Sequence, residues 1–215
     1  MVTFDQWHFP DGETHLPGKM AKKNLRVDGR LTYQYPLYQE GLRQCRARGV
    51  AVDVGAHVGL FSYWMVRDFA QVVAIEPVER HRACWQLNVP ARPGDVLHAC
   101  ALGAHDGTVT MQTVVPSSTG GTYVAGEGTI PLRPLDSFSL DQVDLLKIDV
   151  EGYELEVVIG GRETIRRCHP VCIVEQRPKQ VARMKHGATD AIRYLQRLGG
   201  HVTWTDQRDY VVVFA

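Results

Sequence analysis

Three acidic side chains mark the ends of predicted strands and could together bind a nucleoside. Asp53 lies within a short apolar run, Glu76 follows a β-branched run, and Asp149 ends a third run. In nucleotide-binding folds an acid at the end of the second strand accepts hydrogen bonds from a ribose. Glu76 is the predicted ribose ligand, because a carboxylate can accept from both ribose hydroxyls and an amide or hydroxyl copies this only in part. The alternative is a strand-end acid that contacts only solvent.

The turn after the first run, Asp53-Val54-Gly55-Ala56-His57-Val58-Gly59, favours a cationic ligand without phosphate. Gly55 allows a tight turn, and Gly59 allows a helix or a ligand to approach the backbone closely. Nicotinamide dinucleotides favour three closely spaced glycines around their pyrophosphate, whereas this turn has two glycines and an acid that repels phosphates. Asp53 can instead orient a cationic amino-acid group. S-adenosylmethionine carries a sulfonium, an ammonium and a ribose, so it is the predicted cofactor.

Methyl transfer needs groups that align the acceptor and remove its proton where necessary. Asp149 is the first candidate, as a general base, as a group that orients the acceptor hydroxyl, or as a ligand of the methionine ammonium. Glu175 ends the next strand on the same rim and is predicted to bind the acceptor or act as a base. Glu151 is predicted at the start of a helix, where the helix dipole alone also favours an acid. Lys147 is expected to form a structural ion pair.

These side chains require strands and helices that alternate along the chain. The predicted core strands are 50–54, 71–75, 96–100, 143–149 and 171–175. The predicted helices are 33–48, 60–70, 78–89, 151–168 with an interruption at Gly160-Gly161, and 189–198. The alternation predicts an α/β fold with a mostly parallel sheet and helices on both faces. A closing hairpin, 201–205 with 210–214, predicts an antiparallel strand, and 117–128 is predicted to be a loop.

The chain is predicted to be a single domain, 1–215, with an N-terminal arm and leading helix at 1–48 and a core at 50–215. The first 30 residues show no sustained periodicity, yet their tryptophan and phenylalanine content favours packing over disorder. Two interpretations of this segment remain open. It is a lid or substrate-facing arm that carries His8, Asp11 and His15, or it is a flap that covers the core.

Composition narrows the function further. The 24 basic and 24 acidic residues balance, so no global field favours nucleic acid, although Arg43, Arg46 and Arg48 form a small basic cluster. No apolar run reaches the length of a membrane span, and no signal peptide is evident, so a cytoplasmic location is expected. The five cysteines are odd in number and irregularly spaced, so neither a disulfide framework nor a metal site is predicted.

Four segments together resemble the FkbM family of S-adenosylmethionine-dependent methyltransferases: 52–62, 73–77, 135–137 and Leu146–Glu154. The block Lys147-Ile148-Asp149-Val150-Glu151-Gly152 is the most specific of them. The resemblance implies the class I methyltransferase fold, a seven-stranded sheet whose last strand is antiparallel. The short N-terminus and Val174-Glu175-Gln176 are similar to compact members often encoded by phages. The predicted cofactor-binding residues are Asp53, Gly55, Ala56, His57, Gly59, Glu76, Pro77, Ala101, Leu102 and Asp149.

Three functions are weighed. The leading prediction is O-methylation of a hydroxyl on a small molecule or sugar, in which the acceptor class follows from the family resemblance. The second is methylation of nucleic acid, which the balanced charge disfavours and for which the Asn/Asp-Pro-Pro-aromatic motif of base amino-group methylation is absent. The third is a non-catalytic nucleoside-binding module. The presence of both Glu76 and Asp149 favours an enzyme.

Overall fold

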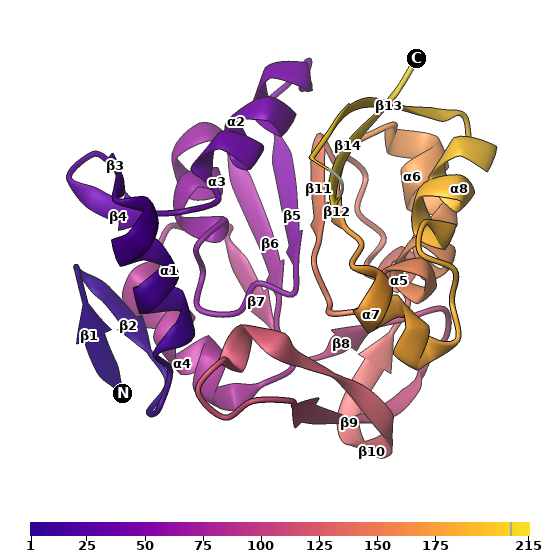
Figure 1. Ribbon diagram of the computed structural model, residues 1–215. Helices are drawn as coiled ribbons and strands as arrows, with labels where there is room; N and C mark the ends of the chain where they lie inside the picture. Colours follow the sequence, from indigo (N-terminus) through magenta and orange to yellow (C-terminus); the bar gives the residue numbers. More distant parts are fainter. Residues whose placement is uncertain (207) are drawn as a thin grey trace.

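A seven-stranded sheet runs through the middle of the molecule in the computed structural model, which describes residues 1–206 and 208–215 (Figure 1). Its strands in chain order are β5 (Val50–Val54), β6 (Gln71–Ile75), β7 (Val96–His98), β11 (Leu145–Ile148), β12 (Val171–Glu175), β13 (Gly200–Thr205) and β14 (Asp209–Phe214). Across the sheet they follow the order β13-β14-β12-β11-β5-β6-β7. Among these strands, β14 runs opposite to the other six and pairs antiparallel with both β12 and β13. The predicted mostly parallel sheet with an antiparallel last strand is confirmed.

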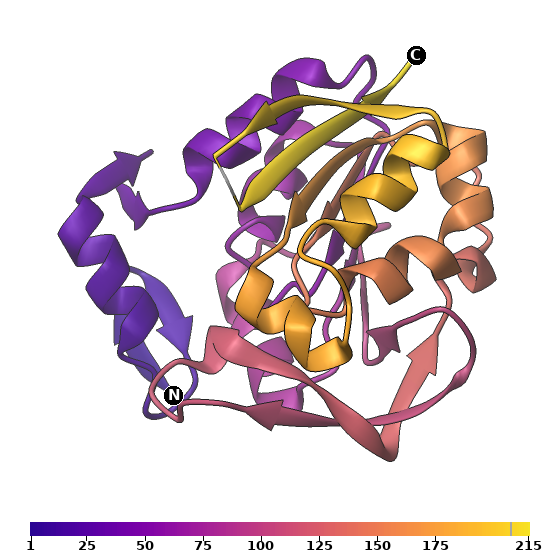
Figure 2. The same cartoon turned by 45° about the vertical axis from the view of Figure 1, so that its right-hand side comes forward.

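Helices cover both faces of the sheet (Figures 1 and 2). The helices on one face are α2 (Tyr35–Gln44), α3 (Ser62–Asp68) and α4 (Glu79–Asn88), and those on the other are α5 (Glu154–Gly160), α6 (Arg162–Cys168) and α8 (Asp190–Arg197). Successive residues of a strand point to opposite faces. Accordingly Ala51 packs with Trp64 of α3, while its neighbour Val52 packs with Val157 of α5. The continuous apolar runs in the sequence reflect this burial on both sides.

The strand order reverses direction between β5 and β11. These two strands pair in parallel, with Lys147 opposite Asp53 and Ile148 opposite Val54. From β5 the chain first builds toward β6 and β7, and later returns to build β11 and β12 on the other side. In open α/β sheets, ligands bind beyond the carboxyl ends of the strands at such a switch point.

A second, three-stranded sheet lies below those carboxyl ends in Figure 1. It consists of β8 (Ala101–Leu102), β9 (Gly107–Thr113) and the long β10 (Thr122–Arg133). The prediction that 117–128 is a loop is wrong over its second half, which belongs to β10. Gly126 lies at two register shifts in the β9–β10 ladder and has a φ of 139°, so its sequence signal was that of a bulge rather than a loop.

The N-terminal arm is folded throughout, although its sequence showed no periodicity. It contains two short hairpins and one helix: β1 (Val2–Phe4), β2 (Trp7–Phe9), α1 (His15–Lys23), β3 (Leu25–Val27) and β4 (Arg30–Thr32). Three-residue strands are too short to show a period. Trp7, Phe9 and Met20 are fully buried in a cluster that includes Val58 and Leu60 of the core. Within the described residues, every helix is too short or too polar to cross a bilayer.

The helix predicted at 151–168 begins later than expected. Glu151 has a φ of 58° and Gly152 a φ of 115°, so this dipeptide forms a left-handed turn and α5 starts at Glu154. A Cβ at position 152 would lie 2.6 Å from the carbonyl oxygen of Gln180, which explains the glycine there. Because Glu151 lies outside the helix, the position of its side chain is set by the turn and not by the helix dipole.

Candidate functional site

A cleft with two adjoining compartments opens at the carboxyl ends of β5, β6, β11 and β12. The Glu76 compartment has a volume of about 50 Å³ and is walled by Ile75, Pro77, Ala101 and Leu102. The Glu175 compartment has a volume of about 210 Å³ and extends toward the N-terminal arm. Both are lined by Gly55, His57, Gly120, Asp149 and Glu151, so the glycine turn lies between them.

Ten of the twelve predicted site residues line this cleft: Gly55, Ala56, His57, Glu76, Pro77, Ala101, Leu102, Asp149, Glu151 and Glu175. Asp53 and Gly59 do not. Gly59 has a φ of 90°, and a Cβ there would lie 2.5 Å from Val89 and 2.9 Å from Trp85. Its role in the structure is therefore the close packing of the turn against α4.

Gly55 lets two strand ends meet. Its φ is 74°, and a Cβ there would lie 2.0 Å from the carbonyl oxygen of Asp149. The amides of Gly55 and Ala56 both donate to the carbonyl oxygen of Ile75. The turn is thus tied to β6 on one side and touches the end of β11 on the other, which holds Asp149 beside it.

Asp53 lies beneath the turn and is fully buried. One of its carboxylate oxygens lies 3.0 Å from the Lys147 ammonium, and the other accepts a hydrogen bond of 2.6 Å from the Ser62 hydroxyl. Lys147 also donates to the carbonyl oxygens of Val54 and Gly55. Burial opposes the charge on Lys147, but the carboxylates of Asp53 and Asp149 outweigh it and raise the pKa of Lys147. The predicted pairing role of Lys147 is found here, and the partner Asp53 supports the turn from below.

Glu76 is buried at the end of β6 and fixed by three hydrogen bonds. One carboxylate oxygen accepts from the amide of His57 at 2.8 Å, and the other accepts from the amide of Val78 at 2.8 Å. His81 Nδ1 lies 3.1 Å from the second oxygen and donates to it. A carboxylate offers about four acceptor positions, so Glu76 has room for about one further hydrogen bond. It cannot accept from two ribose hydroxyls while all three of these bonds persist.

A hydrogen-bond chain joins the glycine turn to the N-terminal arm across the cleft. Glu13 accepts from the Thr119 hydroxyl at 2.7 Å and from the Thr119 amide at 2.5 Å. The same hydroxyl lies 2.9 Å from His57 Nε2. Because the single hydroxyl proton points to Glu13, His57 must donate from Nε2. Burial and the neighbouring His81 and Lys147 lower the pKa of His57, so its ring is neutral in this chain.

Three carboxylates meet on the floor of the Glu175 compartment. Oxygens of Asp149, Glu151 and Glu175 all lie within 4.8 Å of one another. Burial, with the Asp149 charge beside it, raises the pKa of Glu151 to about 8 and that of Glu175 well above its usual range. Carboxylate oxygens also suit hard cations, but an acidic cluster alone does not establish a metal site.

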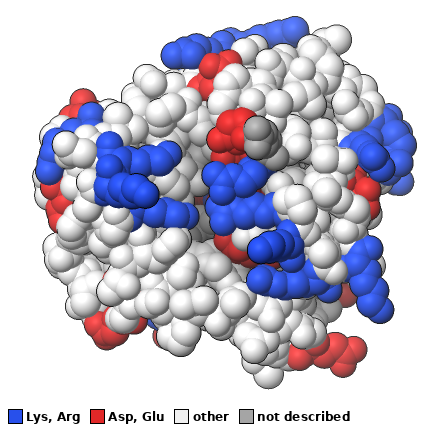
Figure 3. Space-filling view, viewed as in Figure 1, with Lys and Arg blue, Asp and Glu red and all other residues white. Residues whose placement is uncertain are grey.

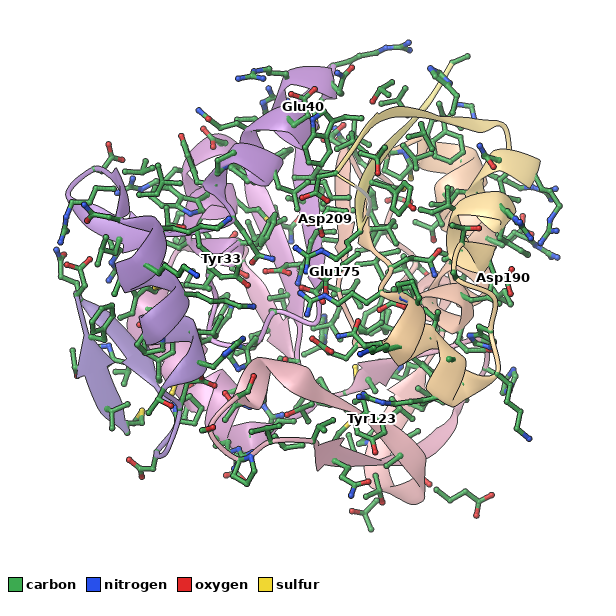
Figure 4. The ribbon with its side chains drawn as sticks, in the orientation of Figure 1. Tyr33, Glu40, Tyr123, Glu175, Asp190 and Asp209 are labelled. Carbon is green, nitrogen blue, oxygen red and sulfur yellow. The ribbon has the colours of Figure 1, made fainter. Side chains whose placement is uncertain are left out.

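Partners beyond the floor hold two of these acids in place. Glu175 accepts a hydrogen bond of 2.5 Å from the Arg177 guanidinium. Glu151 accepts from the side-chain amide of Gln180 in the short helix α7 (Pro178–Val181). Figure 4 shows Glu175 at the end of β12 and Tyr33 on the N-terminal arm, facing the same central space, and both line the compartment.

The structure brings in residues that sequence reasoning did not select. The additional side chains that line or brace the cleft are Glu13, Lys19, Tyr33, His81, Thr119, Gln180 and Arg183. Of the three arm residues considered, His15 lines the cleft, whereas Asp11 pairs with the N-terminal ammonium and the His8 amide donates to Asn88. Glu13 also accepts a local hydrogen bond of 2.9 Å from the amide of Leu16, but its contact with Thr119 had no local signal, because Thr119 lies 106 residues away.

The strand order and the cleft at the switch point define a class I methyltransferase fold, and two solved structures agree. The methyltransferase FkbM from Methylobacillus flagellatus KT aligns with a TM-score of 0.51 at 21% identity, over 79% of this chain and 44% of that one. Magnesium protoporphyrin IX methyltransferase (ChlM) from Synechocystis PCC 6803 with bound SAH aligns with a TM-score of 0.51 at 12% identity, over 94% of this chain and 88% of that one. At these identities the likeness establishes the fold alone.

The methyltransferase FkbM domain family matches residues 53–202, and the chain belongs to this family. Its sequence is also similar to Methyltransferase 1 from Beauveria bassiana (strain ARSEF 2860). The two are 26% identical, and the match covers 51% of this chain and 57% of that protein. This chain therefore matches little more than half the length of that relative and less than half of the Methylobacillus protein.

Proposed function

We propose that this protein is an S-adenosylmethionine-dependent methyltransferase that methylates a hydroxyl group of a small molecule or sugar. The observation that carries the proposal is the two-compartment cleft on either side of the glycine turn. One compartment offers apolar walls and hydrogen-bond acceptors, and the other offers carboxylates beside an open space. This arrangement supports a nucleoside on one side of the turn and a methyl acceptor on the other. Family membership supports the same activity.

The Glu76 compartment fits the ribose of such a cofactor. When His81 carries its single proton on Nδ1 and donates it to Glu76, the Nε2 of the ring is an acceptor. This Nε2 is buried and has no partner among the described residues. Together with the one free position on Glu76, it provides two acceptors for two hydroxyl donors. We therefore refine the expected two-hydroxyl contact of Glu76 into a contact shared between Glu76 and His81.

The Glu175 compartment fits the reacting end. When bound, S-adenosylmethionine supplies an activated methyl group on a positively charged sulfur. Those carboxyls on the floor that are ionised balance that charge, and an ionised carboxylate at Asp149, Glu151 or Glu175 can take the proton of an acceptor hydroxyl. A general base works best when its pKa is close to the operating pH, and the pKa of Glu151, about 8, meets this condition. Tyr33, His15 and Leu16 cover the compartment from the arm and limit the access of water.

Calorimetric titration with S-adenosylmethionine tests the cofactor, with a nicotinamide dinucleotide as the control ligand. Binding of the first and not of the second is expected. A screen of methyl-donor consumption against sugars, hydroxylated metabolites and oligonucleotides then tests the acceptor. The Asp149→Asn variant is expected to retain cofactor binding and lose about 100-fold in turnover, the scale of a lost general base. Full turnover of this variant would show that Asp149 is not the base.

A further inference from the structure

Basic side chains from separate elements surround the mouth of the Glu175 compartment. Lys19 comes from α1, Arg177 follows β12, and Arg183 lies in the short 3-10 helix η3 (Ala182–Met184), and all three line the compartment. Figure 3 shows blue side chains on both sides of the central hollow, with red atoms close to it. The cleft therefore combines an acidic floor with a basic mouth.

Two of these bases contact aromatic rings rather than a paired carboxylate, and the Lys19 ammonium lies 5.5 Å from the centre of the Tyr33 ring. Within residues 1–206 and 208–215, neither Lys19 nor Arg183 forms an ion pair. Arg183 instead rests over the Tyr123 ring, with 4.7 Å between the guanidinium carbon and the ring centre. Lys19 is half-buried, and burial together with the nearby Arg177 charge lowers its pKa. The charges of Glu175 and Glu151 offset part of this effect, and an anion bound at the mouth would offset more of it.

The positions of these bases indicate which ligand carries that anion. The ribose acceptors lie in the Glu76 compartment, which none of the three bases lines. The bases instead lie around the opening through which an acceptor reaches Asp149 and Glu175. Lys19, Arg177 and Arg183 form a small basic group on a chain of zero net charge, which favours a small anion over a polynucleotide.

On the basis of the proposed function, we propose that the methyl acceptor is a small hydroxylated molecule carrying a phosphate or carboxylate group, bound by Lys19, Arg177 and Arg183 at the mouth of the cleft. Guanidinium groups bind such oxyanions through two parallel hydrogen bonds, and an ammonium adds a compact charge. Arg177 is shared with Glu175, so its anion contact also positions the carboxylate floor. The acceptor hydroxyl then points inward and its anionic group outward.

Isothermal titration in saturating S-adenosylhomocysteine tests this inference. The probes are a neutral hexose, its 6-phosphate, the corresponding uronic acid, inorganic phosphate and a short oligonucleotide. The protein is used unmodified, as a Lys19→Met/Arg183→Met variant, and as a Lys22→Met/Lys179→Met control whose exposed lysines lie on the same elements or next to them but outside the cleft. Comparison of the 6-phosphate with the uronic acid separates phosphate from carboxylate recognition.

The unmodified protein and the control are expected to bind an anionic hexose at least about tenfold more tightly than the neutral one, the worth of a charge-assisted hydrogen bond. The Lys19→Met/Arg183→Met variant should lose this preference and keep its affinity for S-adenosylhomocysteine. Four results would overturn the inference: no preference for any anionic probe, an unchanged preference in the variant, an equal loss of cofactor affinity, or preferential binding of the oligonucleotide. If S-adenosylmethionine itself fails to bind, the proposed function fails; if it binds without an anion preference, only this inference fails.

Discussion

The two compartments of the cleft are built in different ways. The Glu76 compartment uses strand ends and turns of the core, and the Glu76 carboxylate is held by the neighbouring His57, Val78 and His81. The Glu175 compartment is assembled from the arm, from β11 and β12, and from the segment that follows β12. Its Glu151 and Glu175 carboxyls have raised pKa values, and two of its bases form no ion pair among the described residues. The Glu76 carboxylate is thus held by hydrogen bonds from residues close to it in the sequence. The Glu175 compartment instead brings together segments that lie far apart in the sequence, and it contains bases that lack ion-pair partners in the part of the chain that the structure describes.

The contrast suggests a division of labour. Preorganised acceptors bind a constant part of a ligand at low cost, because few groups have to move. Unpaired charges and titratable acids respond to what enters. We expect the compartment on the Glu76 side to bind the same cofactor throughout the family, and the compartment on the Glu175 side to vary with the acceptor.

Substitution at the turn should have the largest effect, because it disturbs both compartments. In Gly55→Ala the new Cβ meets the Asp149 carbonyl oxygen, and the residue must also keep a positive φ. Gly94→Ala is a matched control, since Gly94 has a φ of 91° and open space around its Cβ position. We expect Gly94→Ala to cost about 1 kcal/mol of unfolding free energy and Gly55→Ala clearly more, with loss of cofactor binding. Chemical denaturation and calorimetry measure both, and equal costs would contradict the close contact.

Removal of a hydrogen-bond acceptor on the Glu76 side should weaken the binding of the cofactor and leave the binding of the methyl acceptor unchanged. Glu76→Ala is expected to lower S-adenosylmethionine affinity about 100-fold, because it also frees the amides of His57 and Val78. His81→Phe, which keeps an aromatic ring and removes both Nε2 and the Nδ1 donor to Glu76, is expected to cost about tenfold. Glu79→Ala, at an exposed position on the same helix as His81, is the control. If His81→Phe bound S-adenosylmethionine with unchanged affinity, His81 would not contact the ribose and Glu76 would be its sole acceptor of the two.

Proton release on cofactor binding should distinguish the Glu175 side from the Glu76 side. Glu151 holds a proton below its pKa of about 8, and a cation placed beside it lowers that pKa. Binding of S-adenosylmethionine near pH 7 should therefore release protons, which appears as a dependence of the calorimetric heat on the ionisation enthalpy of the buffer. Glu151→Gln should reduce the release. Proton uptake on binding would contradict the arrangement.

The same group makes stability depend on pH in the free protein. The folded chain binds a proton at Glu151 more tightly than the unfolded chain, whose glutamates titrate near their ordinary pKa. Between the ordinary pKa of a glutamate and about pH 8, the unfolding free energy should therefore fall as the pH rises. Glu151→Gln should make this part of the profile less steep, as measured by urea denaturation across the range, and the buried Glu154 and Glu175, whose pKa values are also raised, keep part of the slope.

The smallest expected effect concerns the link between the arm and the turn. Thr119→Val removes the hydroxyl that joins Glu13 to His57 and leaves the shape nearly unchanged. We expect a loss of about 1 kcal/mol of unfolding free energy, with a modest loss of cofactor affinity. Thr108→Val, at an exposed position of β9, is the control. An identical stability of both variants would show that the link contributes nothing.

The sequence predicted the Glu76 side well, because its determinants are local. The strands β5 and β6 were predicted residue for residue, and the glycine turn and Glu76 fall where the pattern placed them. The Glu175 side was predicted only through Asp149, Glu151 and Glu175. Lys19, Tyr33 and Arg183 belong to segments whose approach to the cleft depends on tertiary packing, which no local pattern encodes.

Asp53 illustrates a second limit. An acid before a glycine turn is compatible with a ligand contact and with a buried ion pair, and only the partner distinguishes them. That partner, Lys147, lies directly opposite on β11. Its pairing was anticipated from the sequence, but the identity of the acid was not. The contribution of Asp53 to cofactor binding remains a prediction. We now expect it to act indirectly, by supporting the shape of the glycine turn.

The contact of Glu13 with Thr119 has a consequence for the order in which the molecule folds. It closes a loop of 106 residues, whereas the first two parallel strands are joined by a short crossover. Long loops cost more entropy to close, so distant contacts tend to form after near ones. The β5–β6 pair and the glycine turn can thus form before the arm contacts Thr119. The pairing of β5 with β11 closes a loop of similar length to the arm contact, so completing the sheet and docking the arm carry comparable loop-closure costs.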